Sequence, residues 1–303
     1  MNKVLTLWRF GRPHTLIGSA ISICTLYVIV CDARGGSHPM LLLLALSIGL
    51  SCNLFIVGIN QVADVELDRI NKPYLPIPSG ALSVEQAGLI VQLALATCLL
   101  LALLVSTWLF GILALAAGIG WAYSMPPFHL KRHHLPAAIA ISTVRGVLVN
   151  LGGFMVFNHL VNHTYEVPEN VRLLTVFIIA FSIVIAWFKD LPDLEGDAQF
   201  RIHTLALAYS PRTALIAGHL VVGSAYVLAI GMKYIEFTNA SDHEPATQIL
   251  FFGHLILFGL FLANACTIHL SNMASIRKFY IRFWWFFFAE YLLYLVAYII
   301  PTV

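Results

Sequence analysis

The stretch MLLLLALSIGLSCNLFIVGINQVADVELD, residues 40–68, joins a long apolar run to an acidic end. A helix that crosses a bilayer needs about 20 mostly apolar residues, and residues 40–61 supply that length without one charged side chain. Three carboxylates follow at once, from Asp64, Glu66 and Asp68. Since carboxylates next to hydrocarbon are costly unless they are paired or bound to cations, this stretch predicts a membrane helix with a polar site at one end.

The composition of the whole chain agrees with a membrane protein. Apolar residues make up 59% of the 303 residues, and charged residues only 11%. Soluble domains average about 45–50% apolar and about 25% charged residues, so a soluble enzyme, a disordered tail and a nucleic-acid-binding protein are all disfavoured. The net charge of +2 is too small to indicate a polyanionic partner. The expected surroundings are a lipid bilayer.

Nine apolar stretches are long enough to span. We predict an all-α membrane protein with nine transmembrane helices, forming a single polytopic domain over residues 1–303. Two of the spans meet at Ser106 with almost no loop. The predicted spans are 14–31, 40–61, 85–105, 107–124, 136–157, 172–189, 213–232, 247–270 and 280–300.

Basic residues divide unequally between the two sets of loops. The loops on one side of the membrane hold only Arg34, Arg172 and Lys233, while Arg145 lies within a span. By the positive-inside rule the basic side is cytoplasmic, which predicts a cytoplasmic N-terminus and acidic groups at the cytoplasmic face. The basic side holds 13 of the 17 Lys and Arg residues: Lys3, Arg9, Arg12, Arg69, Lys72, Lys131, Arg132, Lys189, Arg201, Arg212, Arg277, Lys278 and Arg282.

A second acidic group, Asp190-Leu-Pro-Asp193-Leu-Glu-Gly-Asp197, matches the first in spacing. Positions i and i+4 share one helix face, and like charges placed there repel each other. Mg²⁺ relieves such repulsion because it takes oxygen ligands and shares them with phosphates. The pattern therefore predicts two related helix ends that hold a diphosphate leaving group through Mg²⁺. Solvated loop acids neutralised by Arg and Lys are the alternative, but they leave the matched pair of groups unexplained.

The segments Asn60–Asp68 and Asp190–Asp197 resemble the two aspartate motifs of the UbiA superfamily of intramembrane prenyltransferases. The resemblance covers nearly the whole chain. It includes Trp8–Thr15 on the first helix and Tyr123–Arg132 after the fourth span. Within the superfamily the chain is most similar to homogentisate prenyltransferases, especially those of cyanobacterial type. Three stretches carry this similarity: Asn71–Gly80, Thr143–Gly152 and Phe188–Asp197.

This resemblance implies a fold and a reaction. The fold is a ring of helices around a central cavity. The reaction is Mg²⁺-dependent transfer of a phytyl or geranylgeranyl group from its diphosphate to homogentisate, with loss of CO₂. The prenylated methylhydroquinone formed in this way is a precursor of tocopherols, tocotrienols or plastoquinone. The host membrane would be a bacterial inner membrane or a thylakoid membrane.

The resemblance also assigns roles to residues. Asp64, Asp68, Asp193 and Asp197 are the expected catalytic carboxylates. The metal ligands would be Asn60, Asp64, Asp68, Asp190, Asp193 and Asp197. Contacts to the diphosphate are expected from Arg69, Lys72, Tyr123, Lys131, Lys189 and Arg201. The acceptor would contact Arg12, His14, Arg145 and Asn150.

The sequence allows two interpretations of several side chains. Arg145 either forms a buried structural ion pair, with a motif acid as the candidate partner, or contacts the acceptor carboxylate or the diphosphate. Trp187, Phe188 and Phe154 are candidates for cation–π stabilisation of an allylic cation, or simple packing. The run Trp284–Phe288 is expected to face lipid or the membrane interface.

Two alternative functions remain open. A secondary transporter, a different class of protein, also carries polar groups in its spans and internal repeats, although its site lies near the bilayer midplane. A second alternative is a UbiA-superfamily enzyme with another acceptor, namely a chlorophyllide, a naphthoate or a hydroxybenzoate.

Overall fold

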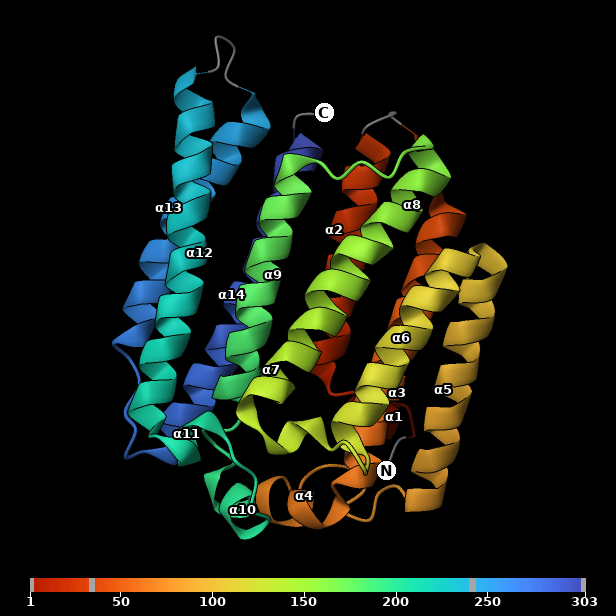
Figure 1. Cartoon of the computed structure of the whole chain (residues 1–303), viewed down its shortest axis with the longest axis vertical. Coiled ribbons are helices and arrows are strands. Elements are labelled where there is room, and N and C mark those ends of the chain that lie inside the picture. The colour runs from red at the N-terminus through yellow and green to blue at the C-terminus, as the bar shows by residue number, and fades with distance from the viewer. Residues whose placement is uncertain (1–2, 33–35, 240–243, 301–303) are drawn as a thin grey trace.

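The computed structural model describes residues 3–32, 36–239 and 244–300, and its regular elements in these ranges are helices (Figure 1). Nine helices in the described ranges are long and apolar enough to cross a membrane. Eight of them are α2 (Pro13–Asp32), α3 (Pro39–Ala63), α5 (Val84–Val105), α6 (Thr107–Ser124), α9 (Glu169–Phe188), α12 (Pro211–Asn239), α13 (Pro245–Ala265) and α14 (Met273–Ile299). The ninth runs over His134–Asn162.

This ninth span is built from three consecutive segments. They are α7 (His134–Ser142), the π-helical η2 (Thr143–Gly152) and α8 (Gly153–Asn162). π-Helical turns are rare and frequently mark functional sites. Arg145 lies in this wider stretch.

All nine predicted spans correspond to observed helices, and most boundaries agree within a few residues. Ser106 ends α5 and begins α6, where its hydroxyl accepts the N–H of Trp108 at 3.2 Å. The predicted span 247–270 is too long, because α13 ends at Ala265. The last span was predicted to begin at residue 280, but α14 begins at Met273, where Asn272 caps the helix by accepting two backbone N–H groups. Because the first turns of α14 carry basic side chains, a search for long apolar stretches places the start of this helix too late.

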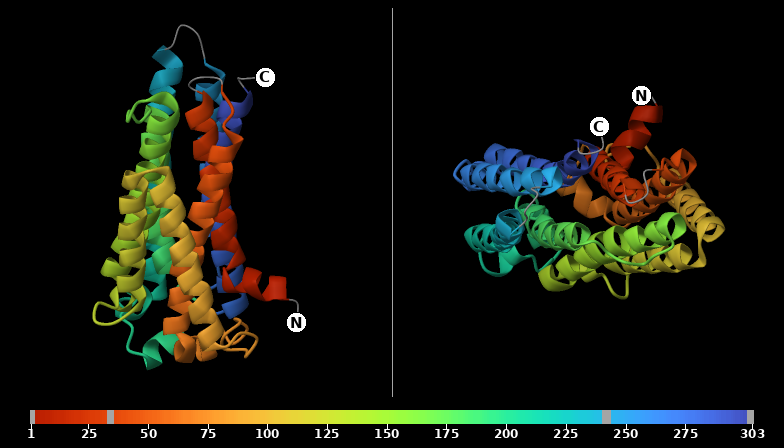
Figure 2. Two further views of the ribbon diagram at one scale, coloured as in Figure 1. Left: turned by 90° about the vertical axis from the view of Figure 1, so that its right-hand side faces the viewer. Right: turned by 90° about the horizontal axis from the view of Figure 1, so that it is seen from above.

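The long helices form two rows that face each other (Figure 2). One row contains α13, α14, α2 and α3, and the other contains α12, α9, α7 with α8, and α6. Contacts of α2 with α3 and α14, of α6 with α3 and η2, and of α9 with η2 and α14 close a ring. The helices α12 and α13 pack outside α9 and α14, where an aromatic core fills the space between them. The ring leaves room for a cavity at its centre.

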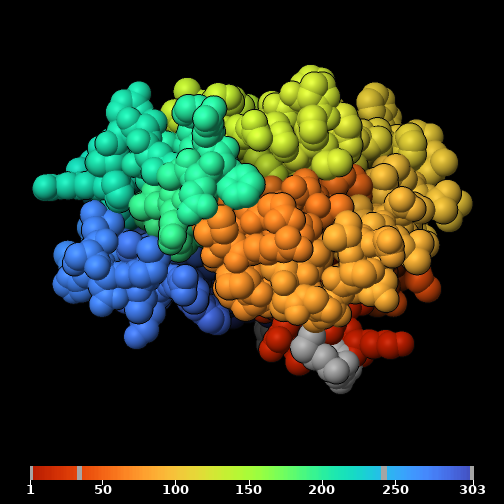
Figure 3. All heavy atoms as spheres, turned by 90° about the horizontal axis from the view of Figure 1, so that it is seen from below, coloured from red at the N-terminus to blue at the C-terminus, as the bar shows by residue number. Residues whose placement is uncertain are grey.

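Short helices gather at one end of the bundle. They are α1 (Lys3–Phe10), α4 (Val65–Asn71), η1 (Leu130–Arg132), α10 (Leu194–Gln199) and α11 (Leu205–Ala208). α4 and α10 contact each other and cover this end, as the view from below shows (Figure 3). The end of α14 lies at the opposite side of the bundle (Figure 1). Arg34, which was assigned to the less basic side, lies outside the described residues.

Both acidic motifs lie where a long helix gives way to a short one. α3 ends at Ala63, Asp64 interrupts the helix with φ −106°, and α4 then begins at Val65. In the second motif Asp193 precedes α10 with a similar φ of −104°. Each short helix begins with an equivalent i, i+4 backbone bond, from Asp68 N–H to Asp64 O at 2.7 Å and from Asp197 N–H to Asp193 O at 3.1 Å. The two matched sequences therefore adopt matched local structures.

Candidate active site

A cavity of about 1030 Å³ occupies the centre of the ring. Its walls come from six spans, namely α2, α3, α6, α7 with η2, α9 and α14, and it is closed at one end by the segments that carry the acidic motifs. Its side walls are largely apolar. The prediction of nine helices around a cavity is confirmed in outline, with the refinement that α5, α12 and α13 contribute no lining residue.

Every carboxylate predicted as a metal ligand lies at the rim of this one cavity. Asp68, Asp190, Asp193 and Asp197 are buried, and Asp64 is half-buried. Asn60 also lines the cavity and donates its amide to Asp64 Oδ2 at 2.9 Å. Two motifs far apart in the sequence therefore supply oxygen donors to the same cavity, the ligand type that Mg²⁺ prefers.

Three lysines pair with these carboxylates. Lys131 pairs with Asp64, Lys72 pairs with Asp193, and Lys189 pairs with Asp190. All three lysines line the cavity. The rim thus alternates anionic and cationic groups, which is the arrangement needed to hold a metal–diphosphate complex through both its cation and its oxygens.

Burial perturbs the rim carboxyls. It raises the pKa of Asp68, although the nearby Arg12 and Lys72 oppose the rise. Burial also raises the pKa of Asp190. For Asp197, burial and the neighbouring Asp190 raise the pKa to about 7. Crowded, poorly hydrated carboxylates of this kind are stabilised in their ionised form by a bound cation.

The other predicted diphosphate contacts separate into two groups. Tyr123 lines the cavity beside Lys131 and Lys189. Arg69 is exposed, pairs with Glu66 at 2.7 Å and is not a lining residue. Arg201 is also exposed and outside the lining. Spacing from the motif does not distinguish the exposed arginines from the lining lysines, since Arg69 and Arg201 both stand within four residues of a motif aspartate, Asp68 or Asp197.

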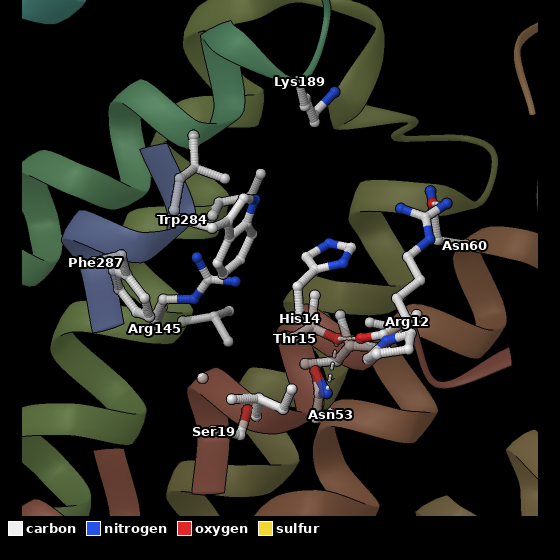
Figure 4. Close-up of a pocket in the computed structure, with 18 of the residues that line it drawn as sticks. Arg12, His14, Thr15, Ser19, Asn53, Asn60, Arg145, Lys189, Trp284 and Phe287 are labelled. Carbon is white, nitrogen blue, oxygen red and sulfur yellow. Dashed lines mark hydrogen bonds between the residues drawn. The ribbon is translucent and has the colours of Figure 1, made fainter. Parts of the chain in front are cut away.

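Arg145 enters the cavity from η2, between two aromatic rings of α14. Its guanidinium carbon lies 5.2 Å from the ring centroids of both Trp284 and Phe287. Its buried Nη1 has no hydrogen-bond partner among the described residues. Figure 4 shows Arg145 and Trp284 on one side, Arg12 and Asn60 on the other, and His14 between them. Within the described chain, no ion pair of Arg145 with a motif acid is present, so the structural reading of this residue is not supported.

The remaining acceptor candidates differ in position. Arg12 lies 3.9 Å from Asp68 and 3.5 Å from Asn60. His14 packs edge-on against Trp284, with ring centroids 4.8 Å apart. Both residues line the cavity. Asn150 does not, because its buried amide donates to Thr175 and accepts the hydroxyl of Tyr291, each at 2.9 Å.

The aromatic predictions need correction. Trp187, Phe188 and Phe154 do not line the main cavity. The prediction that the run 284–288 faces lipid is wrong for Trp284, Phe287 and Phe288, which are buried and line the cavity, whereas Trp285 borders the cavity but is 64% exposed. Successive side chains of a helix point in different directions, so one aromatic run contributes side chains both to the cavity wall and to the outer surface.

Sequence reasoning missed other residues of the site. Asn53 lines the cavity and donates to the hydroxyl of Thr15 at 3.1 Å. Asn71, also a lining residue, bridges the two acidic segments. It stands three residues after Asp68, at a helix-neighbour spacing that could have indicated it. Gln61, which was not assigned as a ligand, is buried and donates its amide to the carbonyl of Phe10 at 2.5 Å, tying α1 to α3.

The position of the acids also bears on the transporter alternative. The carboxylates lie at one end of the bundle, beside α4 and α10, and not midway along the spans (Figure 1). A transporter site is expected near the bilayer midplane. The geometry therefore favours an enzyme that works at the membrane surface.

Comparison with known proteins gives concordant results. The sequence pattern of the UbiA prenyltransferase family matches residues 21–288. The chain is 38% identical to homogentisate phytyltransferase of Synechocystis sp. (strain ATCC 27184 / PCC 6803 / Kazusa), over all of this chain and 98% of that protein. It is 35% identical to the chloroplastic homogentisate solanesyltransferase of Arabidopsis thaliana, over 95% of this chain and 75% of that protein.

The fold is also shared with a solved structure. A UbiA homologue from Archaeoglobus fulgidus, bound to GPP and Mg²⁺, superposes with a TM-score of 0.66 at 16% identity, over 95% of this chain and 99% of that one. At this identity the match concerns the fold alone. The family pattern over most of the sequence, the relative matched over its full length and the nine candidate membrane spans of the described residues agree: this chain is an integral membrane protein that belongs to the UbiA prenyltransferase family.

Proposed function

We propose that this protein transfers a prenyl group from a prenyl diphosphate to homogentisate, in a reaction that requires Mg²⁺ and releases CO₂. The observation that carries the proposal is the single cavity with paired acidic motifs at its rim and an apolar interior. The similarity to homogentisate phytyl- and solanesyltransferases over nearly the whole chain supports homogentisate as the acceptor.

The proposed metal ligands are Asn60, Asp64, Asp68, Asp190, Asp193 and Asp197. These side chains line one rim and offer oxygen ligands, without a thiolate or an imidazole among them, which fits Mg²⁺ rather than a softer metal. Bound Mg²⁺ would neutralise the diphosphate and stabilise it as a leaving group. Lys131, Lys72, Lys189 and Tyr123 are then free to donate to the diphosphate oxygens, with the lysines exchanging carboxylate partners for phosphate ones.

The apolar walls bind the prenyl chain and exclude water. When the bond between the allylic carbon and the diphosphate oxygen breaks, its electron pair leaves with the diphosphate and the prenyl carbon becomes cationic. Of the aromatic side chains that line the cavity, Tyr280 and Phe288 are proposed to face the cation, because aromatic faces attract cations and the Arg145 guanidinium already lies over Trp284 and Phe287. Exclusion of water protects the cation until the electron-rich ring attacks it.

Arg145 is proposed to bind the acceptor carboxylate. Its guanidinium is already stacked between two rings and its Nη1 lacks a partner in the described chain, so a carboxylate there gains a charge-assisted hydrogen bond without displacing an existing one. Arg12 and His14 are proposed to contact the ring hydroxyls. For Asn150 we propose an indirect role: its Oδ1 accepts a hydrogen bond from the hydroxyl of Tyr291, which lines the cavity.

Two further parts of the proposal concern location. The acidic rim faces the cytoplasmic side, together with α1, because basic loops surround it. The membrane is a bacterial inner membrane or a thylakoid membrane. The chain acts as one polytopic domain, because the cavity walls are drawn from α1 through α14.

An assay on membranes that contain the expressed protein tests the reaction. Homogentisate and Mg²⁺ are supplied with phytyl, geranylgeranyl and solanesyl diphosphates in parallel, and the products are identified by mass. A prenylated methylhydroquinone that disappears with EDTA is expected. Folded protein that gives no such product with any donor would refute homogentisate as the acceptor, and chlorophyllide, naphthoate and hydroxybenzoate would be assayed next.

A matched pair of variants tests the rim itself. Asp64→Asn is expected to lower kcat by at least about a hundredfold, the scale of losing one preorganised electrostatic contact. Glu66→Gln lies two residues away, but Glu66 is exposed and outside the cavity lining, so its activity should be unchanged. Equal loss in both variants would contradict the assignment of Asp64.

A further inference from the structure

A second, smaller cavity adjoins the main one. Its volume is about 70 Å³, and it lies between α2, α3, α6 and the η2 and α8 segments of the span His134–Asn162. Its two polar side chains are already engaged, because Ser22 donates to Ser19 O at 3.1 Å and the Tyr27 hydroxyl accepts the N–H of His38 at 2.7 Å. The cavity therefore presents an apolar surface.

This small cavity lies on the side of the main cavity away from the acidic rim. α2 begins at the rim with Pro13, and the residues of α2 that line only the small cavity, Leu26, Tyr27 and Val30, come about three and a half to five turns later. From α3, Leu41 and Ala45 line it near the start of that helix, whereas Asp64 follows its end. A chain whose diphosphate is at the rim would reach this cavity only with its far end.

A thin partition separates the two cavities. Five residues line both of them: Ser22, Ile23, Gly49, Leu113 and Val149. Ile23 rests on the backbone of α3 at Gly49, so closely that a Cβ at residue 49 would lie 2.5 Å from Ile23 Cδ1. Gly49 thus allows the Ile23 side chain its position between the cavities.

We infer that Ile23 limits how far the tail of the prenyl donor extends, and that the small cavity is the subsite that receives the terminal isoprene unit of a donor one unit longer once this side chain is reduced. The inference rests on the proposed prenyl diphosphate donor but not on the identity of the acceptor. Its physical basis is apolar continuity, since the far end of an isoprenoid chain gains free energy wherever more of its surface leaves water.

The chain offers a way to refill the subsite. Gly153 lines the small cavity, and a Cβ built there meets no atom within 4 Å. A leucine at residue 153, on the lining of the small cavity, would therefore meet no steric conflict at its Cβ and is expected to take up part of the cavity. Gly118 is a matched control, because a Cβ there also meets nothing within 4 Å but residue 118 lines neither cavity.

The experiment measures donor binding and turnover for geranylgeranyl diphosphate and for geranylfarnesyl diphosphate, which is one isoprene unit longer, using the full-length protein in detergent with Mg²⁺. Binding is read from the donor-dependent rise of the thermal midpoint, which needs no acceptor, and turnover from product formation. The variants are Ile23→Ala, Ile23→Ala with Gly153→Leu, and Ile23→Ala with Gly118→Leu.

Ile23→Ala is expected to raise the preference for geranylfarnesyl over geranylgeranyl diphosphate about tenfold, the scale of a small change in an apolar pocket. Adding Gly153→Leu should reverse this gain, and adding Gly118→Leu should not. An unchanged preference in folded Ile23→Ala protein, or a gain that Gly153→Leu leaves intact, overturns the inference. Donor binding without product from homogentisate would refute the proposed acceptor while still deciding the role of Ile23.

Discussion

The side-chain amide of Asn71 holds Gly196 across the gap between the two acidic motifs. Its Oδ1 accepts the N–H of Gly196 at 3.0 Å, and its Nδ2 donates to Asp197 Oδ1 at 3.3 Å. A Cβ at residue 196 would lie 2.3 Å from Asn71 Oδ1, so only glycine allows this approach. One side chain at the end of α4 thereby sets the distance between Asp68 on its own helix and Asp197 on α10.

We predict that Asn71→Ala separates the two motifs without removing a carboxylate. The Mg²⁺ concentration needed for half-maximal activity should rise about tenfold or more, because ligands are commonly oriented by such outer hydrogen bonds. Activity at saturating Mg²⁺ should recover in part. A metal titration of the purified variant measures this.

A conservative change separates this effect from misfolding. Asn71→Asp keeps the acceptor for Gly196 N–H and should retain metal binding better than Asn71→Ala, provided that both variants unfold near the wild-type temperature. Equal metal dependence in Asn71→Ala and the wild type would show that Asn71 does not position the motifs.

Lys131 and Arg132 are neighbours with different surroundings. Lys131 lines the cavity and pairs with Asp64, whereas Arg132 is exposed and outside the lining. We expect Lys131→Ala to raise KM for the prenyl diphosphate and to lower kcat, since it removes a charged contact to the leaving group. Arg132→Ala should change neither constant by more than about twofold, as surface substitutions rarely matter. Steady-state kinetics with varied donor distinguishes the two.

Arg145→Lys tests the acceptor contact. Lysine keeps the charge but loses the planar stacking between Trp284 and Phe287 and the bidentate geometry. We predict that KM for homogentisate rises about tenfold while KM for the donor stays the same. Methylhydroquinone, which lacks the carboxylate, should inhibit the wild type and the variant equally. A larger effect on the donor than on homogentisate would assign Arg145 to the diphosphate instead.

A buried polar pair outside the cavity should affect stability rather than chemistry. His254 Nε2 lies 3.4 Å from Glu290 Oε2, and both side chains are fully buried between α13 and α14. Glu290→Ala leaves a buried imidazole without its partner and should cost about 1–3 kcal/mol. The double variant His254→Phe with Glu290→Leu should recover much of that loss, because apolar replacement of a buried pair is often neutral. Thermal unfolding in detergent measures both, and KM for the donor should not move in either.

The sequence alone determined the spans and the acidic rim. Bilayer thickness fixes the length of an apolar helix, so residues such as Met40 to Gln61 identify a span without any knowledge of their neighbours. The two acidic groups were also readable, because a carboxylate beside hydrocarbon is costly and must have a reason. Their matched spacing predicted correctly that Asp64, Asp68, Asp193 and Asp197 share one space.

Only the tertiary structure decided which face of each span meets the cavity. In a membrane both lipid and protein interior are apolar, so an amphipathic pattern is weak and Trp284 cannot be told from Trp285 by sequence. The same reason hid the stacking of Arg145, which depends on the π-helical turns of η2 and on α14 lying opposite. Ile23 over Gly49 and Asn71 over Gly196 are contacts between separate helices, set by how closely two backbones approach, and no local pattern encodes that distance.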